Sequence, residues 1–396
     1  MPLGVWGQHP FRSLFRWLSS TRGTSARIET PTPHESPSVH LLPRILPAAA
    51  LTLAAVFAVS GCTATPAPTA TDAPSPLTFV VITPAPTSSD PFLEQAVAST
   101  RAVATDLGAT VEVLESADAT AVSANVESAL ASSPDLIIGL TDQVLYDFDP
   151  AAASNLDQQF LLVDASAAEP TSNLTAVMFR DFEATYLTGV EAALLAGSGS
   201  ADDTGAAIGV VAPEEDPLVQ SWIDTFAAGV AEVSPSAAPT VAVIGGDRPT
   251  ANVEGAAATA AGLASDGARY LQAVELAPGV NLLDAASDGD FATFGTQVDQ
   301  CALAPGHVVD STIKRVDVAL EAALPAVLSG ETGGVYSYGV AEGGVTLAAL
   351  DDGAAASGCL IVDHPDLLAQ VAEARDRIAD GTTAVPDPLY VTLAPR

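Results

Sequence analysis

The chain has 396 residues, with 14 basic and 48 acidic side chains and a formal net charge of -34 at pH 7. Binding nucleic-acid phosphates requires a basic surface, so this composition excludes a nucleic-acid-binding protein. No G-x-x-x-x-G-K-[ST] sequence is present, which excludes an ATPase subunit of the P-loop kind.

An apolar segment near the N-terminus predicts export. Residues 45–59 follow Arg44 and form an apolar run that is too short for a good membrane-spanning helix, which is typical of a signal peptide. The run ends at Ser60, Gly61 and Cys62, which resemble the lipobox of bacterial lipoproteins. This resemblance implies that Cys62 is lipidated and anchors the protein to the extracytoplasmic face of the cell membrane. The alternative is an uncleaved anchor.

The first 76 residues therefore divide into three parts. Residues 1–40 show no periodic pattern, and we expect them to be disordered or foreign to the native protein. Residues 41–61 form the predicted lipoprotein signal peptide. Residues 62–76 are rich in Pro, Thr and Ala, which predicts a disordered tether between the anchor and the folded body.

The body alternates short apolar runs with amphipathic helical patterns. In its first part we expect strands at residues 77–82, 110–114, 135–139, 160–163 and 176–179, and helices at 92–107 and 119–131. Further helices are expected at 182–195, 217–230, 251–264 and 365–379, and strands at 207–211, 239–244, 269–274, 291–294, 335–340 and 344–350. This alternation predicts an α/β protein with two lobes, each a parallel sheet flanked by helices, and a cleft at the carboxyl ends of the strands.

Residues 295–320 contain the only lysine of the chain, Lys314. We expect a strand end, a loop and then a helix that Asp310 or Ser311 caps, with Lys314 in the first turn. The helix dipole disfavours a cation at that end, so it gives no reason for the lysine. An arginine does not reproduce a compact ammonium with three donors. We therefore predict that Lys314 lies in the cleft; the alternative is a surface lysine.

Two cysteines remain in the body of the exported chain. A disulfide between Cys301 and Cys359 is expected in an oxidising compartment, and the alternative is two buried free thiols. His307 and His364 are the histidines of the body, and no Cys/His cluster has the spacing of metal ligands. We predict no metal site and no cofactor.

Several pieces of the body match one family in order and spacing. They lie at residues 135–139, 160–164, 179–193, 208–211, 226–229, 298–300, 311–314 and 377–386. Together they resemble the basic membrane protein family of substrate-binding lipoproteins, over residues 79–388. The resemblance implies a type I periplasmic-binding fold, a monomer, a purine nucleoside as ligand, and an ABC permease and ATPase as partners. The expected lobes are residues 77–181 with 300–332, and residues 182–299 with 333–396.

The resemblance also implies which residues bind the ligand. Lys314 matches a lysine that contacts the ligand, and Asp164 matches an acidic residue at a strand end. Phe92 matches a phenylalanine that stacks on the base. Trp222 and Phe226 are both candidates for a second stacking residue. Stacking on a base contributes about 1–3 kcal/mol in nucleic-acid binders, so two aromatic faces would hold a nucleobase well.

The chain departs from the family pattern at three places. Leu93 stands at an Asn position, with Asp90 displaced, and Ala277 lies in the segment that matches a Gly-rich loop. Gln297 stands where the family has an acid, unless Asp299 substitutes for it. A lost carboxylate removes a hydrogen-bond acceptor worth about 1.5–3 kcal/mol. The expected ligand is a small polar molecule, either a nucleoside or another solute.

Two alternatives to transport follow from the same residues. The first is a ligand-sensing or structural surface lipoprotein of this fold. The second is an enzyme, because residues 311–314 match the S-x-x-K signature of serine penicillin-recognising enzymes. Those enzymes also need a K-T-G strand, which a chain with a single lysine does not contain. We therefore predict a binding protein without enzymatic activity.

Overall fold

The computed structural model describes residues 76–167, 171–198, 207–213, 217–246, 248–274, 276, 280–351 and 353–387. The predicted signal peptide, Cys62, Ala277 and the predicted tether up to residue 75 lie outside these residues. Among the helices of the described part, none combines the length and the apolar character needed to cross a membrane.

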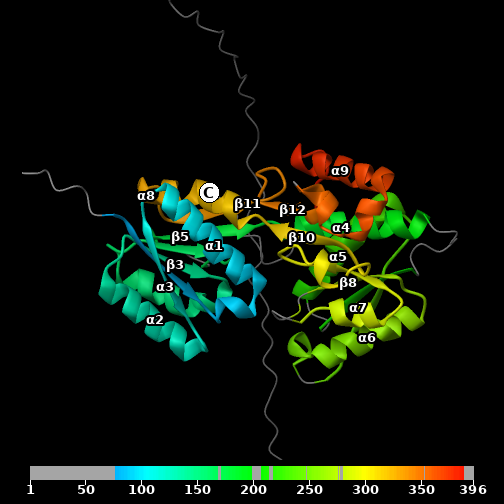
Figure 1. Cartoon of the computed structure of the whole chain (residues 1–396), viewed down its shortest axis with the longest axis horizontal. Helices are drawn as coiled ribbons and strands as arrows, with labels where there is room; N and C mark the ends of the chain where they lie inside the picture. The colour runs from blue at the N-terminus through cyan, green and yellow to red at the C-terminus, as the bar shows by residue number, and fades with distance from the viewer. Residues whose placement is uncertain are drawn as a thin grey trace, which may run out of the picture. The chain divides into compact units, whose positions relative to one another are not determined.

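The first sheet consists of β1 (Thr78–Thr83), β2 (Thr110–Glu115), β3 (Leu136–Leu140), β4 (Phe160–Val163), β5 (Leu174–Phe179) and β11 (Gly334–Tyr338). Its order is β11-β5-β4-β3-β1-β2, and all neighbours are parallel. Every residue of β3 and β4 is buried, because helices cover both faces of the sheet (Figure 1).

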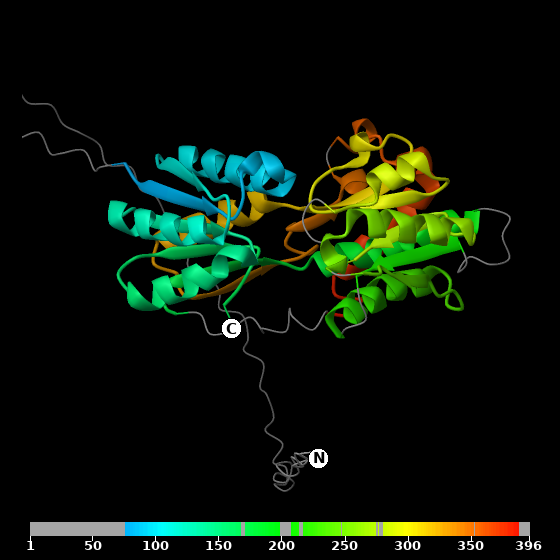
Figure 2. The same cartoon turned by 90° about the horizontal axis from the view of Figure 1, so that it is seen from below.

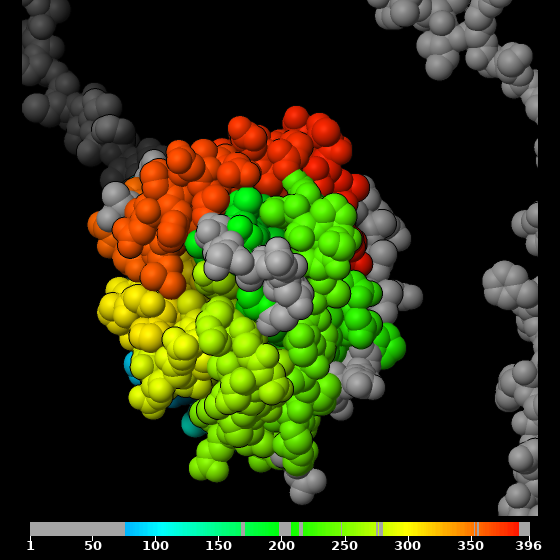
Figure 3. All heavy atoms as spheres, turned by 90° about the vertical axis from the view of Figure 1, so that its right-hand side faces the viewer, coloured from blue at the N-terminus to red at the C-terminus, as the bar shows by residue number. Residues whose placement is uncertain are grey.

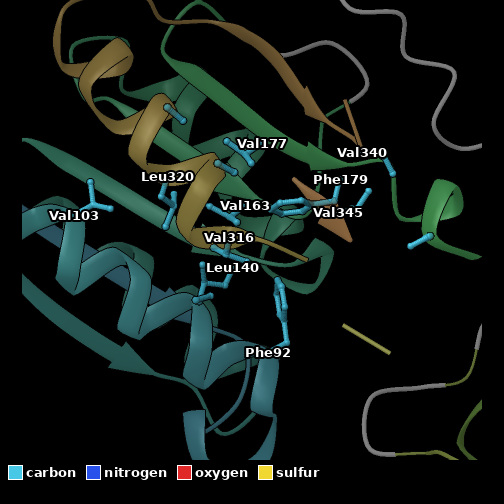
Figure 4. Close-up of a cluster of buried hydrophobic side chains, with 14 of the residues drawn as sticks. Phe92, Val103, Leu140, Val163, Val177, Phe179, Val316, Leu320, Val340 and Val345 are labelled. Atoms are coloured by element: carbon cyan, nitrogen blue, oxygen red, sulfur yellow. The ribbon is translucent and has the colours of Figure 1, made fainter. Parts of the chain in front are cut away.

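The helices on this sheet are α1 (Pro91–Asp106), α2 (Ala119–Ser132), α3 (Leu145–Ser154) and α8 (Val316–Leu328). The first and last pack together around the hydrophobic core of Figure 4, and α2 and α3 pack on the opposite face. The carboxylate of Asp90 caps α1 by accepting a hydrogen bond from the N–H of Phe92, and Pro91 presets the first turn. Helix α3 was not predicted, because Pro150 interrupts its pattern.

The second sheet consists of β6 (Ile208–Ala212), β7 (Thr240–Val243), β8 (Tyr270–Ala273), β9 (Ala292–Gly295), β10 (Val308–Lys314) and β12 (Val345–Leu347). Its order is β12-β10-β9-β8-β6-β7. All neighbours are parallel except the pair β10 and β12, which is antiparallel.

The helices on this sheet are α4 (Asp181–Ser198), α5 (Pro217–Val233), α6 (Val253–Ser265), α7 (Leu283–Asp288) and α9 (Pro365–Ala379). Helix α4 packs against α5, α9 and β10, whereas α6 and α7 surround a separate core on the other face. In Figure 3, the red α9 lies beside the orange segment that precedes it, in agreement with its contacts to the short helix Leu360–Asp363.

The chain passes between the two sheets three times (Figure 2). β5 is followed by α4 of the second sheet, β10 by α8 of the first, and β11 by β12 of the second. The predicted lobe boundaries are therefore wrong at two places: residues 308–314 belong to the second sheet and residues 334–338 to the first. Periodicity identifies a strand, but it does not say which sheet supplies the hydrogen-bond partners.

Lys314 lies at the end of a strand and not, as predicted, in the first turn of a helix. Residues 308–314 are all buried in β10, and α8 begins only at Val316. Neither Asp310 nor Ser311 caps a helix. The β-branched residues that dominate the segment favour a pleated strand over a helical turn.

Cys301 and Cys359 form a disulfide, with the two sulfurs 2.01 Å apart. Both residues are buried in the core of the second sheet. The bond spans 58 residues of sequence and joins the segment before β10 to the segment before α9. Of the two alternatives for these cysteines, the structure contains the disulfide.

Two carboxyl groups are buried beside each other under the second sheet. Glu191 of α4 and Asp310 of β10 are both 0% exposed. Asp310 accepts hydrogen bonds from the N–H of Ser311 at 2.7 Å and of Ala349 at 3.0 Å. Burial raises the pKa of Asp310 to about 7. Burial and the neighbouring Asp310 raise the pKa of Glu191 well above its usual value, so this pair retains a proton at neutral pH.

We expect Glu191→Gln to reduce the pH dependence of stability. The raised pKa values mean that the folded protein holds protons which the unfolded protein releases above pH ~4, the ordinary carboxyl range. The free energy of unfolding of the wild type therefore falls as pH rises from this range through about 7. Gln keeps a similar shape without titrating. Urea unfolding at pH 5 and pH 8 measures the difference, and an unchanged difference in the variant would contradict the buried proton.

Candidate functional site

A cavity of about 1060 Å³ lies at the carboxyl ends of the parallel strands. The first sheet contributes residues at the ends of β4 and β5, and α1 contributes its first turn. The second sheet contributes residues at the ends of β8, β9 and β10, and α5 contributes part of its first half. Open α/β sheets bind ligands at this edge, and the volume suits a small molecule.

Lys314 connects the two sheets at the wall of this cavity. Its Nζ lies 2.8 Å from Oδ2 of Asp164 and 3.1 Å from Oδ2 of Asp181. Asp164 follows β4 of the first sheet, whereas Lys314 ends β10 of the second. The lysine is 7% exposed, so little water is available to replace either carboxylate.

The protonation of this cluster follows from burial and charge. Burial disfavours the ammonium, but Asp164 and Asp181 outweigh it, and the pKa of Lys314 lies above its usual value. Burial raises the pKa of Asp164, and the ammonium of Lys314 opposes that shift. Lys314 is therefore charged at neutral pH, and its ammonium forms ion pairs with two carboxylates.

Arg180, the second base of the cavity wall, connects two of the three crossings between the sheets. Its Nε donates to Glu183 at 2.6 Å and its Nη2 to Glu342 at 2.5 Å. Its Nη1 donates to the carbonyl oxygen of Ser337 at 3.2 Å. Gly339 leaves room for this arrangement, because a Cβ there would lie 2.2 Å from Nη2 of the arginine. Each of the three guanidinium nitrogens thus has a partner.

Two of the three predicted aromatic residues lie at the cavity wall. Phe92 is 1% exposed, and its ring centroid lies 5.6 Å from Nζ of Lys314. Trp222 of α5 also lines the cavity. Phe226 does not: it is fully buried and packs edge-on against Phe294, with 6.3 Å between ring centroids. It lies one turn further along α5, where the helix faces the core.

The predicted polar residues also divide into two groups. Asp90, Asp164, Gln297 and Lys314 line the cavity. Asp299 does not, because its Oδ1 accepts a hydrogen bond from the N–H of Cys301 at 2.9 Å and its side chain borders a neighbouring cavity of about 780 Å³. Asp299 therefore does not supply the acid that Gln297 lacks.

The backbone beside the cavity adopts left-handed conformations at residues other than glycine. φ is 68° at Thr141, 63° at Asp164 and 70° at Gln297, directly after β3 and β4 and shortly after β9. Each such conformation costs about 1–3 kcal/mol and persists only where the surrounding structure enforces it. Their location at one edge of the two sheets supports a functional role for this edge.

Several polar wall residues were missed: Asp142, Arg180, Asp181, Gln272 and Glu342. Three of them, Asp142, Arg180 and Asp181, stand just after a predicted strand, which is the same signal that marked Asp164. Glu342 lies in the crossing from β11 to β12, and only the fold brings it to the cavity.

The S-x-x-K sequence does not form a serine–lysine pair. Ser311 is 0% exposed, and its Oγ accepts a hydrogen bond from the N–H of Gln300 at 3.0 Å. Lys314 lies three positions further along the same strand, so the two side chains point to opposite faces of the sheet. The geometry needed for a lysine-activated serine is therefore missing at these two residues.

Residues 77–356 match a family model described as Bmp, ABC transporter substrate-binding protein PnrA-like. Two curated relatives are uncharacterized lipoproteins of Pyrococcus furiosus and Pyrococcus abyssi. Each is 28% identical, over 210 and 202 residues, which is 51% and 49% of this chain. The chain spans about half the length of these relatives, 52% and 49%.

Solved structures of ABC transporter solute-binding proteins are similar in fold. The protein from Aeropyrum pernix K1 is 20% identical with a TM-score of 0.62, covering 79% of this chain and 94% of that one. The protein from Conexibacter woesei DSM 14684 is 20% identical with a TM-score of 0.59, covering 78% and 99%. A transcriptional activator of the comK gene from Bacillus halodurans, 16% identical, also has a TM-score of 0.59, over 78% and 99%. The predicted type I periplasmic-binding-like fold is confirmed.

Proposed function

The chain belongs to the Bmp family of PnrA-like ABC transporter substrate-binding proteins, and from this premise we propose that it delivers a nucleoside-like solute to an ABC importer. The solute would bind in the cavity between the two sheets. The chain would release it to a permease whose ATPase is a separate chain. Solute binding is the role of the family; the solute, the binding position and the partners are our proposal.

The observation that carries this proposal is the combination of aromatic and charged groups in one cavity wall. Phe92 and Trp222 place aromatic side chains in this wall. The carboxylates of Asp164 and Asp181 retain acceptor lone pairs for sugar hydroxyls, and the ammonium of Lys314 holds both carboxylates at the wall. The three crossings between the sheets allow a hinge motion that closes the cavity over its solute.

We also propose that Cys62 carries a lipid and holds the body at the extracytoplasmic face of the membrane. The lipobox-like residues Ser60 and Gly61 before this cysteine support it, as do the relatives named as lipoproteins. Intact mass of the protein extracted from membranes tests the anchor, since an unmodified thiol at residue 62 would refute it.

A thermal-shift screen against nucleosides, bases, sugars and amino acids tests the solute. At 100 times its Kd, a bound solute stabilises the folded protein by about 2.7 kcal/mol. We expect nucleosides to raise the Tm. A shift with sugars or amino acids alone would contradict the nucleoside, and no shift with any solute would contradict binding in this cavity.

A pair of variants tests whether the nucleoside binds in the cavity. Phe92→Leu removes the proposed stacking face, and we expect it to weaken nucleoside binding about tenfold. Phe148→Leu is the matched control, because Phe148 is equally buried but packs against Phe160 on the opposite face of the first sheet. Equal loss of affinity in both variants would mean that the effect comes from stability and not from stacking.

The alternative is a ligand sensor of the same fold with no transport role. The similar fold of a transcriptional activator means that the fold alone does not decide between these roles. Uptake of a labelled solute by cells with and without this gene separates them, since a sensor would leave the uptake rate through the permease unchanged.

A further inference from the structure

Among the described residues, each of the two basic side chains in the cavity wall pairs with two carboxylates, so its single positive charge does not balance them. Lys314 pairs with Asp164 and Asp181, and Arg180 pairs with Glu183 and Glu342. The ammonium of Lys314 and all three nitrogens of the Arg180 guanidinium already have hydrogen-bond partners within the described part of the chain. A phosphate or carboxylate of a solute would have to displace an acidic side chain that is already in place.

The wall as a whole is strongly acidic. The described lining residues include two bases against six acids, a formal charge of -4. The acids are Asp90, Asp142, Asp164, Asp181, Glu342 and Asp387. Charges of one sign in a cleft with low-dielectric walls reinforce each other, because little solvent screens them there.

Asp142 is the wall acid that is most available to a solute. It follows β3, it is exposed, and its carboxylate has no hydrogen-bond or ion-pair partner within the described part of the chain. Its charge also contributes to the raised pKa of Asp164, after burial and the charge of Asp181, which places the two carboxylates in one electrostatic neighbourhood.

We propose that this site selects its solute by charge: it accepts polar solutes that are neutral or carry a positive group, and it excludes anionic forms such as phosphate monoesters. This inference rests on the proposed function, because it assumes that the cavity is the solute site. It adds the charge class of the solute and a residue, Asp142, that helps to determine it.

We call this selection of neutral or positively charged solutes over anions the charge rule. Calorimetric titration of the full-length protein with two sets of matched compounds tests it. One set is adenosine, its 5′-phosphate and its 5′-amino-5′-deoxy analogue; the other is glucose, glucose 6-phosphate and glucosamine. In the set that binds, we expect the phosphate to bind at least about 100-fold more weakly than the neutral compound, because like charges at close range cost several kcal/mol. We expect the amine to bind at least as tightly as the neutral compound.

The salt dependence and a pair of variants distinguish an effect of the cavity wall from an effect of the net charge of the whole chain. We expect Asp142→Asn to reduce the preference for the neutral compound over the phosphate about threefold. Asp157→Asn removes the same charge from an exposed position before β4, at the opposite edge of the sheet, and should leave the ratio unchanged. Raising the salt from 0.05 to 0.5 M should weaken a surface effect far more than an effect inside the cavity.

The outcomes distinguish this inference from the proposed function. If the glucose set binds with this order of charge preference and the adenosine set does not bind, the charge rule holds and the nucleoside is wrong. If a phosphate binds as tightly as its neutral partner, or if both variants change the ratio equally, the charge rule is wrong. Absence of binding by every compound would overturn both.

Discussion

Lys314→Met is expected to destabilise the folded protein by about 3–5 kcal/mol, the usual result of removing one partner from a buried ion pair. The substitution keeps most of the volume of the side chain but leaves Asp164 and Asp181 close together without the ammonium between them. Asp164 then has burial and a neighbouring charge raising its pKa, with no lysine to oppose them.

The pH dependence of this loss has a definite sign. In the wild type, the raised pKa of Lys314 keeps its contribution to stability intact throughout the neutral range, and that contribution is lost only at strongly alkaline pH. In the variant, the raised pKa of Asp164 stabilises the folded state at acidic pH, where the carboxyl group is protonated. At higher pH the folded state is destabilised, because the buried carboxyl group loses its proton. The loss of stability should therefore be larger at pH 8 than at pH 5.

Urea unfolding of three proteins at both pH values measures this effect. The double variant Lys314→Met with Asp164→Asn removes one of the two carboxylate charges left without the ammonium and should recover part of the lost stability. Wild-type stability of Lys314→Met at pH 8 would show that Lys314 is solvated and not held between the sheets. That result would also contradict the pairing of Lys314 with Asp164 and Asp181, on which the proposed exclusion of anionic solutes depends.

Gly229→Ala is expected to destabilise the protein by about 3 kcal/mol, at the upper end of the usual cost of overpacking. Helices α4 and α5 cross so closely that a Cβ on Gly229 would lie 1.9 Å from the carbonyl oxygen of Tyr186. A backbone atom does not move aside as the end of a flexible side chain does. Helix α4 would have to separate from α5, and α4 also packs against α9 and β10.

Gly262→Ala provides the matched control for this prediction. Gly262 lies inside α6, is exposed, and has no atom within 4 Å of an added Cβ. Alanine there should stabilise the protein by about 0.5–1 kcal/mol, because it reduces the conformational entropy of the unfolded chain. The two variants make the same chemical change in a helix, so unfolding free energies that shift in the same direction would contradict the close crossing.

Most helices and strands were predictable because their signals are local. Helix α9 begins and ends at the predicted residues 365 and 379, with a proline in its first turn. The buried strands β3 and β4 were predicted from their apolar runs, within one residue at each end. Two helices were missed, because Pro150 interrupts the pattern of α3 and the six residues of α7 carry too little periodicity.

The cavity residues were predictable only in part. Phe92, Trp222 and Asp164 were identified through the family resemblance, and all three line the cavity. The same resemblance left Phe226 and Asp299 as candidates, and neither lines it. Spacing along a helix or loop does not determine how far a side chain reaches beyond its own element.

The order of the amino acids was sufficient to predict the alternation of strands and helices, the acidity of the chain and the single lysine among its basic residues. Tertiary structure alone decided that β10 joins the second sheet, that β11 joins the first, and that Lys314 meets Asp164, a residue 150 positions away. Periodicity and capping depend on neighbours within a few residues. Strand partners and ion pairs depend on segments that come together only when the core is packed.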